Sequence, residues 1–193
     1  MIRFCDVFFS LLGLIVLSPI FVIIALCIVL DSRGGVFYRQ VRVGRDGKDF
    51  RLFKFRSMAS GADKKGLITV GAKDSRVTRV GYFLRKYKLD ELPQLLNVVR
   101  GEMSLVGPRP EVRKYVDMYT VEQRKVLAVA PGITDYASIE YADENTILGQ
   151  ARDPDRAYVE QIMPDKIRYN MKYIDNRCLK EYFKIIFLTL MKI

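Results

Sequence analysis

The chain has 193 residues with 32 Lys and Arg against 22 Asp and Glu, which is enough sequence for one basic domain. It contains no His, and this excludes Ser-His and Cys-His nucleophile pairs, imidazole general bases and His-ligated zinc or haem, so any chemistry must use carboxylates, Lys, Arg, Tyr or an oxygen-ligated cation. The three cysteines, Cys5, Cys27 and Cys178, have no CxxC spacing and predict neither a disulfide framework nor a zinc site.

The N-terminal segment Val7–Leu30 contains no charged residue and is long enough to span a bilayer. A cleavable signal peptide is disfavoured, because Arg3 is the only basic residue before the segment and no small-x-small site follows it. Ser18 and Pro19 lie near the middle. Since an internal proline removes an amide donor and clashes with the preceding turn, we expect the helix to kink or break there.

Two membrane topologies follow from that break. Each half has about 11 residues, roughly 16 Å of helix or half a hydrocarbon core, which fits a re-entrant hairpin in one leaflet. A kinked helix that crosses the bilayer remains the alternative. All basic residues except Arg3 follow the apolar segment, so the positive-inside rule places them in the cytoplasm. We therefore divide the chain into a membrane segment, residues 1–31, and a cytosolic domain, residues 32–193.

The cytosolic domain is predicted to be α/β, mostly helical with a small β-hairpin. Val36–Val43 and Phe50–Phe55 are rich in Val, Phe and Tyr, and a Gly-containing turn at residues 44–47 separates them, which predicts two paired strands. Ser57–Asp74 has few large apolar residues and is predicted to be a loop that could close on a substrate.

Helices are expected over most of the remaining sequence. They run from a Ser75 cap to about Tyr87, from Asp90 to a stop at Gly101, over Glu111–Tyr119, from a Thr120/Gln123 capping box to before Pro131, and within Pro164–Ile193. From Leu179 onward, apolar residues alternate with lysines. This pattern suits an amphipathic helix at a membrane interface, with an ordinary core helix as the alternative.

Basic residues crowd the hairpin region. Eight lie between positions 33 and 56: Arg33, Arg39, Arg42, Arg45, Lys48, Arg51, Lys54 and Arg56. Such a face beside a membrane segment attracts anionic lipid, and also polyanions such as phosphate substrates or nucleic acid. Lys54 and Arg56 share a strand face next to an aromatic run, so we select them as candidate phosphate ligands.

Two acidic residues, Asp90 and Glu91, stand where a helix is expected to begin. Helix capping is the simplest interpretation. An Asp whose pKa of about 3.9 is lowered further by the helix dipole could instead ligate Mg²⁺ or attack phosphorus without help from histidine. Arg109 lies between Pro108 and Pro110, which restrict the backbone on both sides. Its guanidinium could therefore bind a phosphate with two hydrogen bonds; the alternative is an ordinary exposed Arg on a rigid surface loop.

Together these features resemble the monotopic phosphoglycosyl transferases, also called the bacterial sugar transferase family, over nearly the whole chain. The resemblance rests on the order and spacing of Ser18-Pro19, Lys54-Phe55-Arg56-Ser57-Met58, Asp74-Ser75-Arg76-Val77-Thr78-Arg79-Val80-Gly81, Phe83-Leu84-Arg85, Leu89-Asp90-Glu91-Leu92-Pro93-Gln94-Leu95, Gly107-Pro108-Arg109-Pro110 and Pro131-Gly132-Ile133-Thr134.

The resemblance implies transfer of a phospho-sugar from a UDP-sugar to polyprenyl (undecaprenyl) phosphate, releasing UMP, as the first membrane step of bacterial glycoconjugate assembly. It implies a monotopic enzyme whose catalytic domain lies on the cytoplasmic face of the inner membrane, anchored by a re-entrant helix. The implied partners are the two substrates and membrane lipid, without nucleic acid, and a homodimer stays open.

The resemblance also implies residue roles. Asp90 would be the nucleophile that forms a covalent phospho-sugar intermediate and a ligand of Mg²⁺, and Glu91 would assist the polyprenyl phosphate step. The substrate phosphates would be neutralised by four basic side chains, Lys54, Arg56, Arg85 and Arg109.

Two positions depart from the family's common pattern. Lys88 replaces a frequent Ser or Thr, and Asp135–Tyr141 replaces a segment that often begins Gly-Leu and can contact the sugar, so the sugar stays open. We expect a minimal catalytic unit, with no further membrane helix or regulatory domain before Met1. Two other functions remain as alternatives: a Mg²⁺-dependent nucleotide-sugar hydrolase, and a non-enzymatic adaptor that binds anionic lipid.

Overall fold

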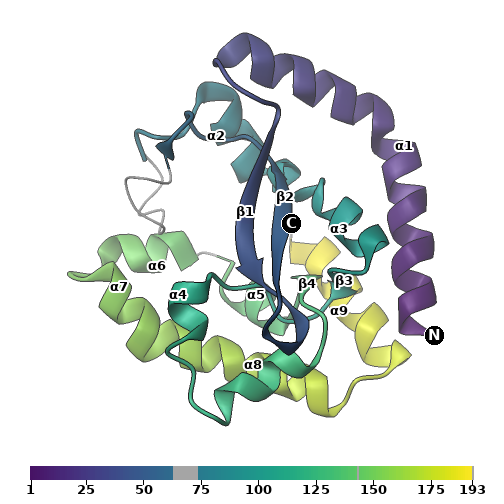
Figure 1. Ribbon diagram of the computed structural model, residues 1–193, viewed down its shortest axis with the longest axis vertical. Coiled ribbons are helices and arrows are strands. Elements are labelled where there is room, and N and C mark those ends of the chain that lie inside the picture. Colours follow the sequence, from purple (N-terminus) through teal and green to yellow (C-terminus); the bar gives the residue numbers. More distant parts are fainter. Residues whose placement is uncertain (63–73, 143, 193) are drawn as a thin grey trace.

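A computed structural model describes residues 1–62, 74–142 and 144–192 (Figure 1), so most of the predicted loop Ser57–Asp74 lies outside the described residues. The described helices are α1 (Ile2–Asp31), α2 (Arg79–Lys86), α3 (Gln94–Arg100), α4 (Arg113–Val116), α5 (Tyr136–Glu140), α6 (Glu144–Gln150), α7 (Pro154–Ala157), α8 (Met163–Asp175) and α9 (Leu179–Lys192). The described strands are β1 (Phe37–Val43), β2 (Asp49–Phe55), β3 (Ser104–Val106) and β4 (Gly132–Thr134).

The apolar N-terminal segment forms one continuous helix, α1, with Pro19 inside it. The predicted break at Ser18-Pro19 is therefore wrong, whereas the predicted kink matches the bend of α1 in Figure 1. The Ser18 hydroxyl donates to the carbonyl of Ile15 at 2.8 Å, a back-bond that often accompanies bending. A bend relieves the clash of the proline ring with the preceding turn while the remaining helical hydrogen bonds persist.

The N-terminal end of α1 is fixed to the rest of the domain by polar contacts. Arg3 donates to two backbone carbonyls near the end of α3, at 2.6 and 3.0 Å. The carboxylate of Asp6 is buried and accepts from the Ser104 hydroxyl, the Leu105 amide and the Tyr182 hydroxyl, each at 2.9 Å. Because a buried charge needs such partners, these bonds hold α1 firmly against β3 and α9.

The C-terminal end of α1 is fixed in the same way. The guanidinium of Arg56 donates to three carbonyls just beyond the helix, two at 2.6 Å and one at 2.8 Å. Asp31 accepts from the amide of Val80 at 3.1 Å, which joins α1 to the first turn of α2. Both ends of α1 therefore contact the same folded domain, and in Figure 1 the helix arches around one side of it.

The predicted hairpin is confirmed. β1 and β2 pair antiparallel from Phe37 opposite Phe55 to Val43 opposite Asp49, and a short 3-10 turn, Arg45–Gly47, connects them. Phe55 is buried, and its ring meets that of Phe21 from α1 edge-on, with centroids 5.1 Å apart. The hairpin is thus packed against α1, which places Lys54 at a fixed position relative to that helix.

The second sheet was not predicted. β3 and β4 pair in parallel, Ser104 opposite Gly132 and Val106 opposite Thr134. Each strand has only three residues, too few for an alternating pattern to stand out in the sequence. This sheet determines how the loop after β3 approaches the remainder of the domain.

Several predicted helices shift or shorten. Thr78, not Ser75, caps α2, since its hydroxyl accepts from the Gly81 amide at 2.9 Å. The predicted helix Glu111–Tyr119 shortens to α4. The Thr120/Gln123 capping box is confirmed by reciprocal bonds of 2.9 and 3.2 Å, although it begins a 3-10 segment, Gln123–Ala128. The segments α5 to α7 were not predicted.

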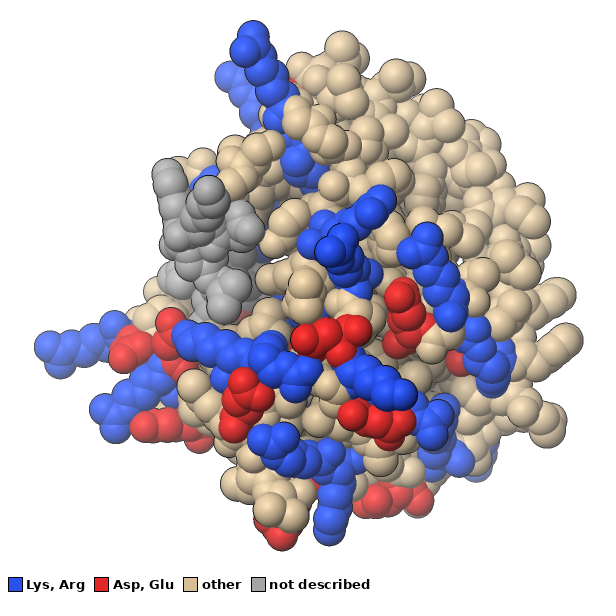
Figure 2. Space-filling view, in the orientation of Figure 1, with Lys and Arg blue, Asp and Glu red and all other residues tan. Residues whose placement is uncertain are grey.

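The surface over α1 is apolar. α1 is the one described helix long and apolar enough to cross a membrane, and most of its side chains are exposed. Figure 2 shows this region free of charged residues, which gather on the rest of the same face. α9 buries Tyr182 and Ile185 against the domain, as a core helix does, and it exposes Phe187 and Leu190 on its other side. Its location at a membrane interface stays a prediction.

Candidate active site

The two acidic residues lie in a short 3-10 turn, Leu89–Glu91, between α2 and α3. Lys88 before it adopts a left-handed conformation, φ 56° and ψ 16°, which few residues other than Gly adopt without cost. The α-helix begins at Gln94 rather than at the predicted Asp90. The turn therefore directs Asp90 inward, where it is only 6% exposed, instead of leaving it on an open helix end.

Glu91 forms the centre of an ion cluster. The ammonium of Lys54 donates to its Oε1 at 2.9 Å. Arg109 binds both carboxylate oxygens, Nη1 donating to Oε2 at 3.1 Å and Nη2 donating to Oε1. These two cations hold the pKa of Glu91 well below its usual value despite burial, and Glu91 in turn raises the pKa of Arg109. Glu91 therefore stays ionised and fixes both cations in place.

Asp90 has a different environment. Within the part of the chain that the structure describes, no hydrogen bond or ion pair engages its carboxylate. Burial raises the pKa of Asp90, and the negative charge of Glu91 adds to this, whereas Lys54, Arg85 and Arg109 act in the opposite direction. The expected lowering of this pKa by a helix dipole is wrong, because desolvation dominates and Asp90 precedes the helix.

The loop that carries Arg109 is fixed by the β3–β4 sheet. Gly107 and Gly132 touch so closely that a Cβ atom on Gly132 would lie 2.1 Å from the Gly107 nitrogen, so only glycine fits there. The backbone amide of Arg109 donates to Oδ2 of Asp135 at 3.0 Å. Asp135 is fully buried and also caps α5. The guanidinium therefore reaches Glu91 from a rigid support.

The structure brings together four of the predicted site residues: Asp90, Glu91, Lys54 and Arg109. Arg85, partly buried on α2, is close enough to Asp90 to influence its pKa. Arg56 is not part of this group. It is 7% exposed, and its guanidinium is occupied by the backbone carbonyls beyond α1. β2 ends at residue 55, so the strand alternation that was expected to align Arg56 with Lys54 stops one residue too early.

Two functional candidates were not singled out from the sequence, Arg42 and Asp135. Arg42 donates to the carbonyl of Pro110 at 3.1 Å, and it lies on the same hairpin face as Lys54. The two-residue alternation along both strands carries enough information to find Arg42. Asp135 appeared only as a departure from a family pattern, and its bond to the Arg109 amide depends on a tertiary contact that a single sequence does not reveal.

The acidic residues available for a divalent cation are few. The described residues contain no cluster of three or more His, Cys, Asp or Glu side chains arranged for a metal. Glu91 is occupied by Lys54 and Arg109, so Asp90 is the carboxylate left to bind a cation at this site. Mg²⁺ commonly takes one or two protein carboxylates and completes its shell with water and substrate phosphates. One carboxylate without a bound partner, beside Lys54, Arg85 and Arg109, fits that mode.

Comparisons with known proteins show the family of this chain. Residues 1–193 match the family described as bacterial sugar transferase. The chain is 37% identical over 191 residues to a UDP-N-acetylgalactosamine-undecaprenyl-phosphate N-acetylgalactosaminephosphotransferase of Aeromonas hydrophila, covering 97% of this chain and 42% of that protein. It is 40% identical over 193 residues to a UDP-glucose:undecaprenyl-phosphate glucose-1-phosphate transferase of Klebsiella pneumoniae, covering 98% and 39%.

A third relative is shorter. The chain is 42% identical over 120 residues to a putative undecaprenyl-phosphate N-acetylgalactosaminyl 1-phosphate transferase of Bacillus subtilis, covering 62% of this chain and 67% of that protein. The chain thus spans about two fifths of the length of the first two relatives. The matched relatives include both acetamido-sugar and plain hexose transferases by name.

Proposed function

The chain belongs to the bacterial sugar transferase family, and from this premise we propose that it is a phosphoglycosyl transferase that moves a sugar phosphate from a UDP-sugar to undecaprenyl phosphate, releasing UMP. One observation supports this most strongly: Asp90 is a buried carboxylate without a bound partner among the described residues, and three cations act on it. A carboxylate in that setting is suited to attack an electrophile that carries negative charge.

The proposed reaction has two displacements at one phosphorus. An oxygen of Asp90 attacks the phosphorus that bears the sugar, the bond from that phosphorus to the bridging oxygen breaks, and UMP leaves. A phosphate oxygen of undecaprenyl phosphate then attacks the same phosphorus and displaces the carboxylate, which gives the sugar-diphospho-lipid and restores Asp90. Both displacements concentrate negative charge on the oxygens of the transferred phosphoryl group. This charge is offset by three cations, Lys54, Arg85 and Arg109.

Glu91 acts mainly through the cations that it holds. Its carboxylate fixes Lys54 at 2.9 Å and Arg109 at 3.1 Å, so both donors are placed before substrate arrives and cost little ordering on binding. When a phosphate enters, it can compete with Glu91 for the same guanidinium and ammonium groups. The family role of assisting the lipid phosphate step is compatible with that exchange of partners.

Mg²⁺ is the proposed cofactor, and Asp90 would hold it together with the donor's phosphates. When bound it would neutralise phosphate charge and make UMP a better leaving group.

The anchoring of α1 supports a re-entrant rather than a crossing segment. Arg3 and Asp6 at one end, and Asp31 at the other, all bond to the same basic domain. A helix that crossed the bilayer would carry one of these ends to the opposite side. We therefore place the catalytic domain on the cytoplasmic face of the bacterial inner membrane, with the bend at Ser18 and Pro19 inside one leaflet.

The test is a reconstitution of the protein in lipid nanodiscs with Mg²⁺ and a panel of UDP-sugars, with and without undecaprenyl phosphate. With the acceptor present, we expect UMP and labelled glycolipid to form in equal amounts over many turnovers. Without the acceptor, we expect at most one equivalent of UMP per enzyme. Continuous UMP release without acceptor would favour a nucleotide-sugar hydrolase. Neither product with any donor would favour a lipid-binding adaptor and overturn the proposal.

A further inference from the structure

The hairpin β1–β2 has an outer face that is turned away from the candidate active site. Side chains alternate along a strand, so Lys54 lies on the face toward Glu91 and the residues next to it lie on the outer face. The outer face carries the odd-numbered residues of both strands: Phe37, Arg39, Val41, Arg51, Phe53 and Phe55.

Two guanidinium groups meet on this outer face over one aromatic ring. Arg39 lies opposite Phe53 in the strand pairing, and its guanidinium is 4.9 Å from the centroid of the Phe53 ring. Arg100, the last residue of α3, approaches the same ring to 4.7 Å. Phe53 itself is only 6% exposed. Cation–π attraction to the ring therefore holds two positive charges from separate elements close together.

The positive charge on the outer face is not neutralised by a carboxylate. Within residues 1–62, 74–142 and 144–192, no ion pair engages the side chain of Arg39, Arg51 or Arg100, and all three are exposed. Two cations over one ring lie within roughly a Debye length of each other, about 10 Å at 0.1 M salt, so they repel. A bound anion would remove that repulsion.

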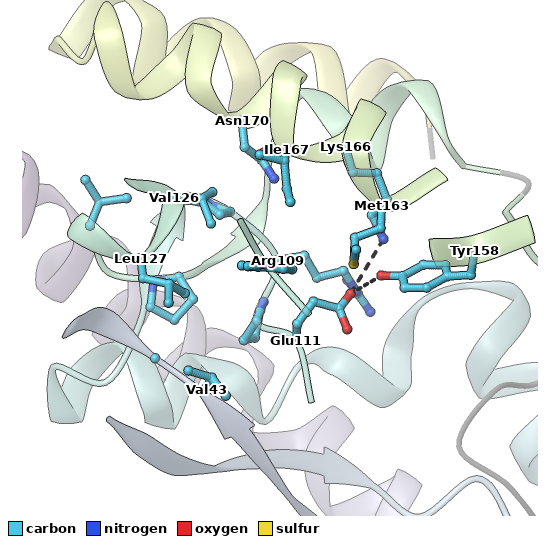
Figure 3. Close-up of a pocket in the computed structure, with 16 residues that line it drawn as sticks. Val43, Arg109, Glu111, Val126, Leu127, Tyr158, Met163, Lys166, Ile167 and Asn170 are labelled. Atoms are coloured by element: carbon cyan, nitrogen blue, oxygen red, sulfur yellow. Dashed lines mark hydrogen bonds and ion pairs between the residues drawn. The ribbon is translucent and has the colours of Figure 1, made fainter. Parts of the chain in front are cut away.

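The charges below the inner face of the hairpin are arranged differently. Arg42 lies 3.8 Å from one oxygen of Glu111, and Lys166 lies 3.9 Å from the other and 3.0 Å from Glu144. Figure 3 shows Lys166 and the hydroxyl of Tyr158 directed at Glu111. Two cations thus face two carboxylates there. An added anion would meet balanced charge around Glu111, whereas on the outer face it would meet uncompensated positive charge.

The outer face lies between the two places where α1 contacts the domain. Phe55, on the same face as Phe53, meets Phe21 in the second half of α1. At the other end of α1, Arg3 donates to the carbonyls of the two residues that precede Arg100. The proposed re-entrant topology keeps both ends of α1 at the cytoplasmic interface. These contacts therefore place the two guanidinium groups at the depth of the lipid headgroups.

The neighbours of Arg39 are suited to that depth. Phe37 and Val41 flank it on the same face of β1 and are 42% and 50% exposed. Exposed apolar side chains interleaved with basic ones are typical of a surface that meets both the headgroups and the upper acyl chains of a bilayer. Figure 2 shows basic side chains bordering the apolar surface over α1.

From the proposed membrane topology we infer that the outer face holds an anionic phospholipid, whose phosphate is bound between Arg39 and Arg100. Guanidinium groups bind phosphate oxygens through paired, charge-assisted hydrogen bonds, and Phe53 holds both groups ready for this contact. Because Lys54 and the ion cluster of Glu91 lie on the other face, this lipid takes no part in the transfer reaction. It fixes the orientation of the domain on the membrane.

The test uses tryptophan fluorescence. The chain has no Trp, so Phe53→Trp provides a single fluorophore inside the proposed site. The variant is placed in nanodiscs that contain equal amounts of phosphatidylcholine and phosphatidylglycerol, and only one of the two lipids is brominated near the top of its acyl chain. Since bromine quenches tryptophan on contact, we expect brominated phosphatidylglycerol to quench about twofold or more as strongly as brominated phosphatidylcholine.

Matched variants separate this site from general attraction of a basic protein to anionic lipid. In the Phe53→Trp protein, Arg39→Gln with Arg100→Gln should make the two brominated lipids quench equally. Arg45→Gln with Lys48→Gln removes the same charge from exposed positions in the hairpin connection and should leave the preference unchanged. Native mass spectrometry of the protein without the Trp substitution, released from the same discs, should show bound phosphatidylglycerol that is lost with Arg39→Gln and Arg100→Gln.

Three results would overturn the inference. They are equal quenching by both lipids in the Phe53→Trp protein together with no retained phosphatidylglycerol, a preference that survives loss of Arg39 and Arg100, and a preference abolished by a small fraction of undecaprenyl phosphate, which would assign the site to the acceptor. An unchanged thermal midpoint shows that the glutamine variants keep their fold. Each readout is lipid binding rather than UMP release, so these results leave the transferase proposal intact.

Discussion

At the residue scale, the difference between Asp90 and Glu91 is the main feature of the site. Both are buried carboxylates, yet Glu91 is bound by Lys54 and Arg109 whereas Asp90 has no bound partner among the described residues. Neighbouring acids with opposite pKa shifts are typical of sites in which one acid reacts and the other positions its surroundings.

The raised pKa of Asp90 predicts the acid limb of the pH profile. Because the nucleophile must be ionised, kcat/KM should fall on acidification at a pH above about 3.9, the value for an ordinary Asp. Lys54 lowers this pKa, so Lys54→Met should move the limb to higher pH as well as reduce activity. Lys48→Met, at an exposed position in the hairpin connection, serves as control. An acid limb at the same pH in the Lys54 variant and the wild type would contradict this assignment.

The ionised carboxylate of Asp90 should also lower the free energy of unfolding at neutral pH. A carboxylate whose pKa is higher in the folded than in the unfolded state binds its proton more tightly when folded. Stability is therefore lost as the pH rises from the unfolded value of about 3.9 through the raised folded pKa. Asp90→Asn should raise the thermal midpoint by about 2–4 °C at pH 7, for roughly 1 kcal/mol, while abolishing activity. A lower midpoint in differential scanning fluorimetry would show that the neighbouring cations outweigh desolvation and that the Asp90 charge stabilises the fold.

Most of the candidate site could be predicted from local sequence, and the exceptions have physical causes. Asp90, Glu91, Lys54 and Arg109 are recognisable because they lie in short motifs with restricted backbone geometry. Arg56 looked equivalent to Lys54 by strand alternation, but its role depends on where α1 ends, which is a tertiary fact. The pKa of Asp90 depends mainly on burial. The sequence pattern suggests that a helix dipole lowers this pKa, but it does not reveal the burial, whose effect on the pKa is larger.

At the scale of elements, long periodic segments were predictable and short ones were not. The hairpin β1–β2, α3, α8 and α9 appear in the pattern of apolar residues. β3 and β4 have three residues each, and they exist because they pair with each other. Proline in the middle of α1 was expected to kink or break the helix, and the helix is bent but continuous.

The cap on the end of α1 gives a stability prediction. Arg56 is buried and donates three charge-assisted hydrogen bonds to carbonyls beyond α1, so the loss of these bonds in Arg56→Met should lower the free energy of unfolding by about 2–3 kcal/mol. Arg51→Met, at an exposed position on β2, should change this free energy by less than about 0.5 kcal/mol. Both values come from chemical denaturation in detergent. Equal stability of the two variants would mean that water replaces the guanidinium at those carbonyls.

At the scale of the whole molecule, an apolar helix is combined with a basic domain, and the whole chain has 32 Lys and Arg against 22 Asp and Glu. This arrangement suits an enzyme whose two substrates are both phosphates, one in water and one in the membrane. The anchored α1 would hold the acceptor's headgroup region next to Asp90, and the basic surface would gather the nucleotide donor.

The re-entrant topology can be tested with two epitopes. One is placed before Met1 and the other within the hairpin connection at residues 45–47. In right-side-out spheroplasts both should resist external protease, and in inverted vesicles both should be cleaved, because Arg3 and Asp6 tie the N-terminus to the domain. Cleavage of the N-terminal epitope alone in intact spheroplasts would establish a crossing helix and contradict the anchoring argument.

The most direct measurement is the mass of the intact protein after mixing with Mg²⁺ and its UDP-sugar donor in the absence of undecaprenyl phosphate. The account predicts that one phospho-sugar is added, that peptide mapping places it on Asp90, that undecaprenyl phosphate removes it, and that Asp90→Asn forms none. An adduct on another side chain, or undiminished adduct in Asp90→Asn, would contradict the assignment of this carboxylate as the nucleophile.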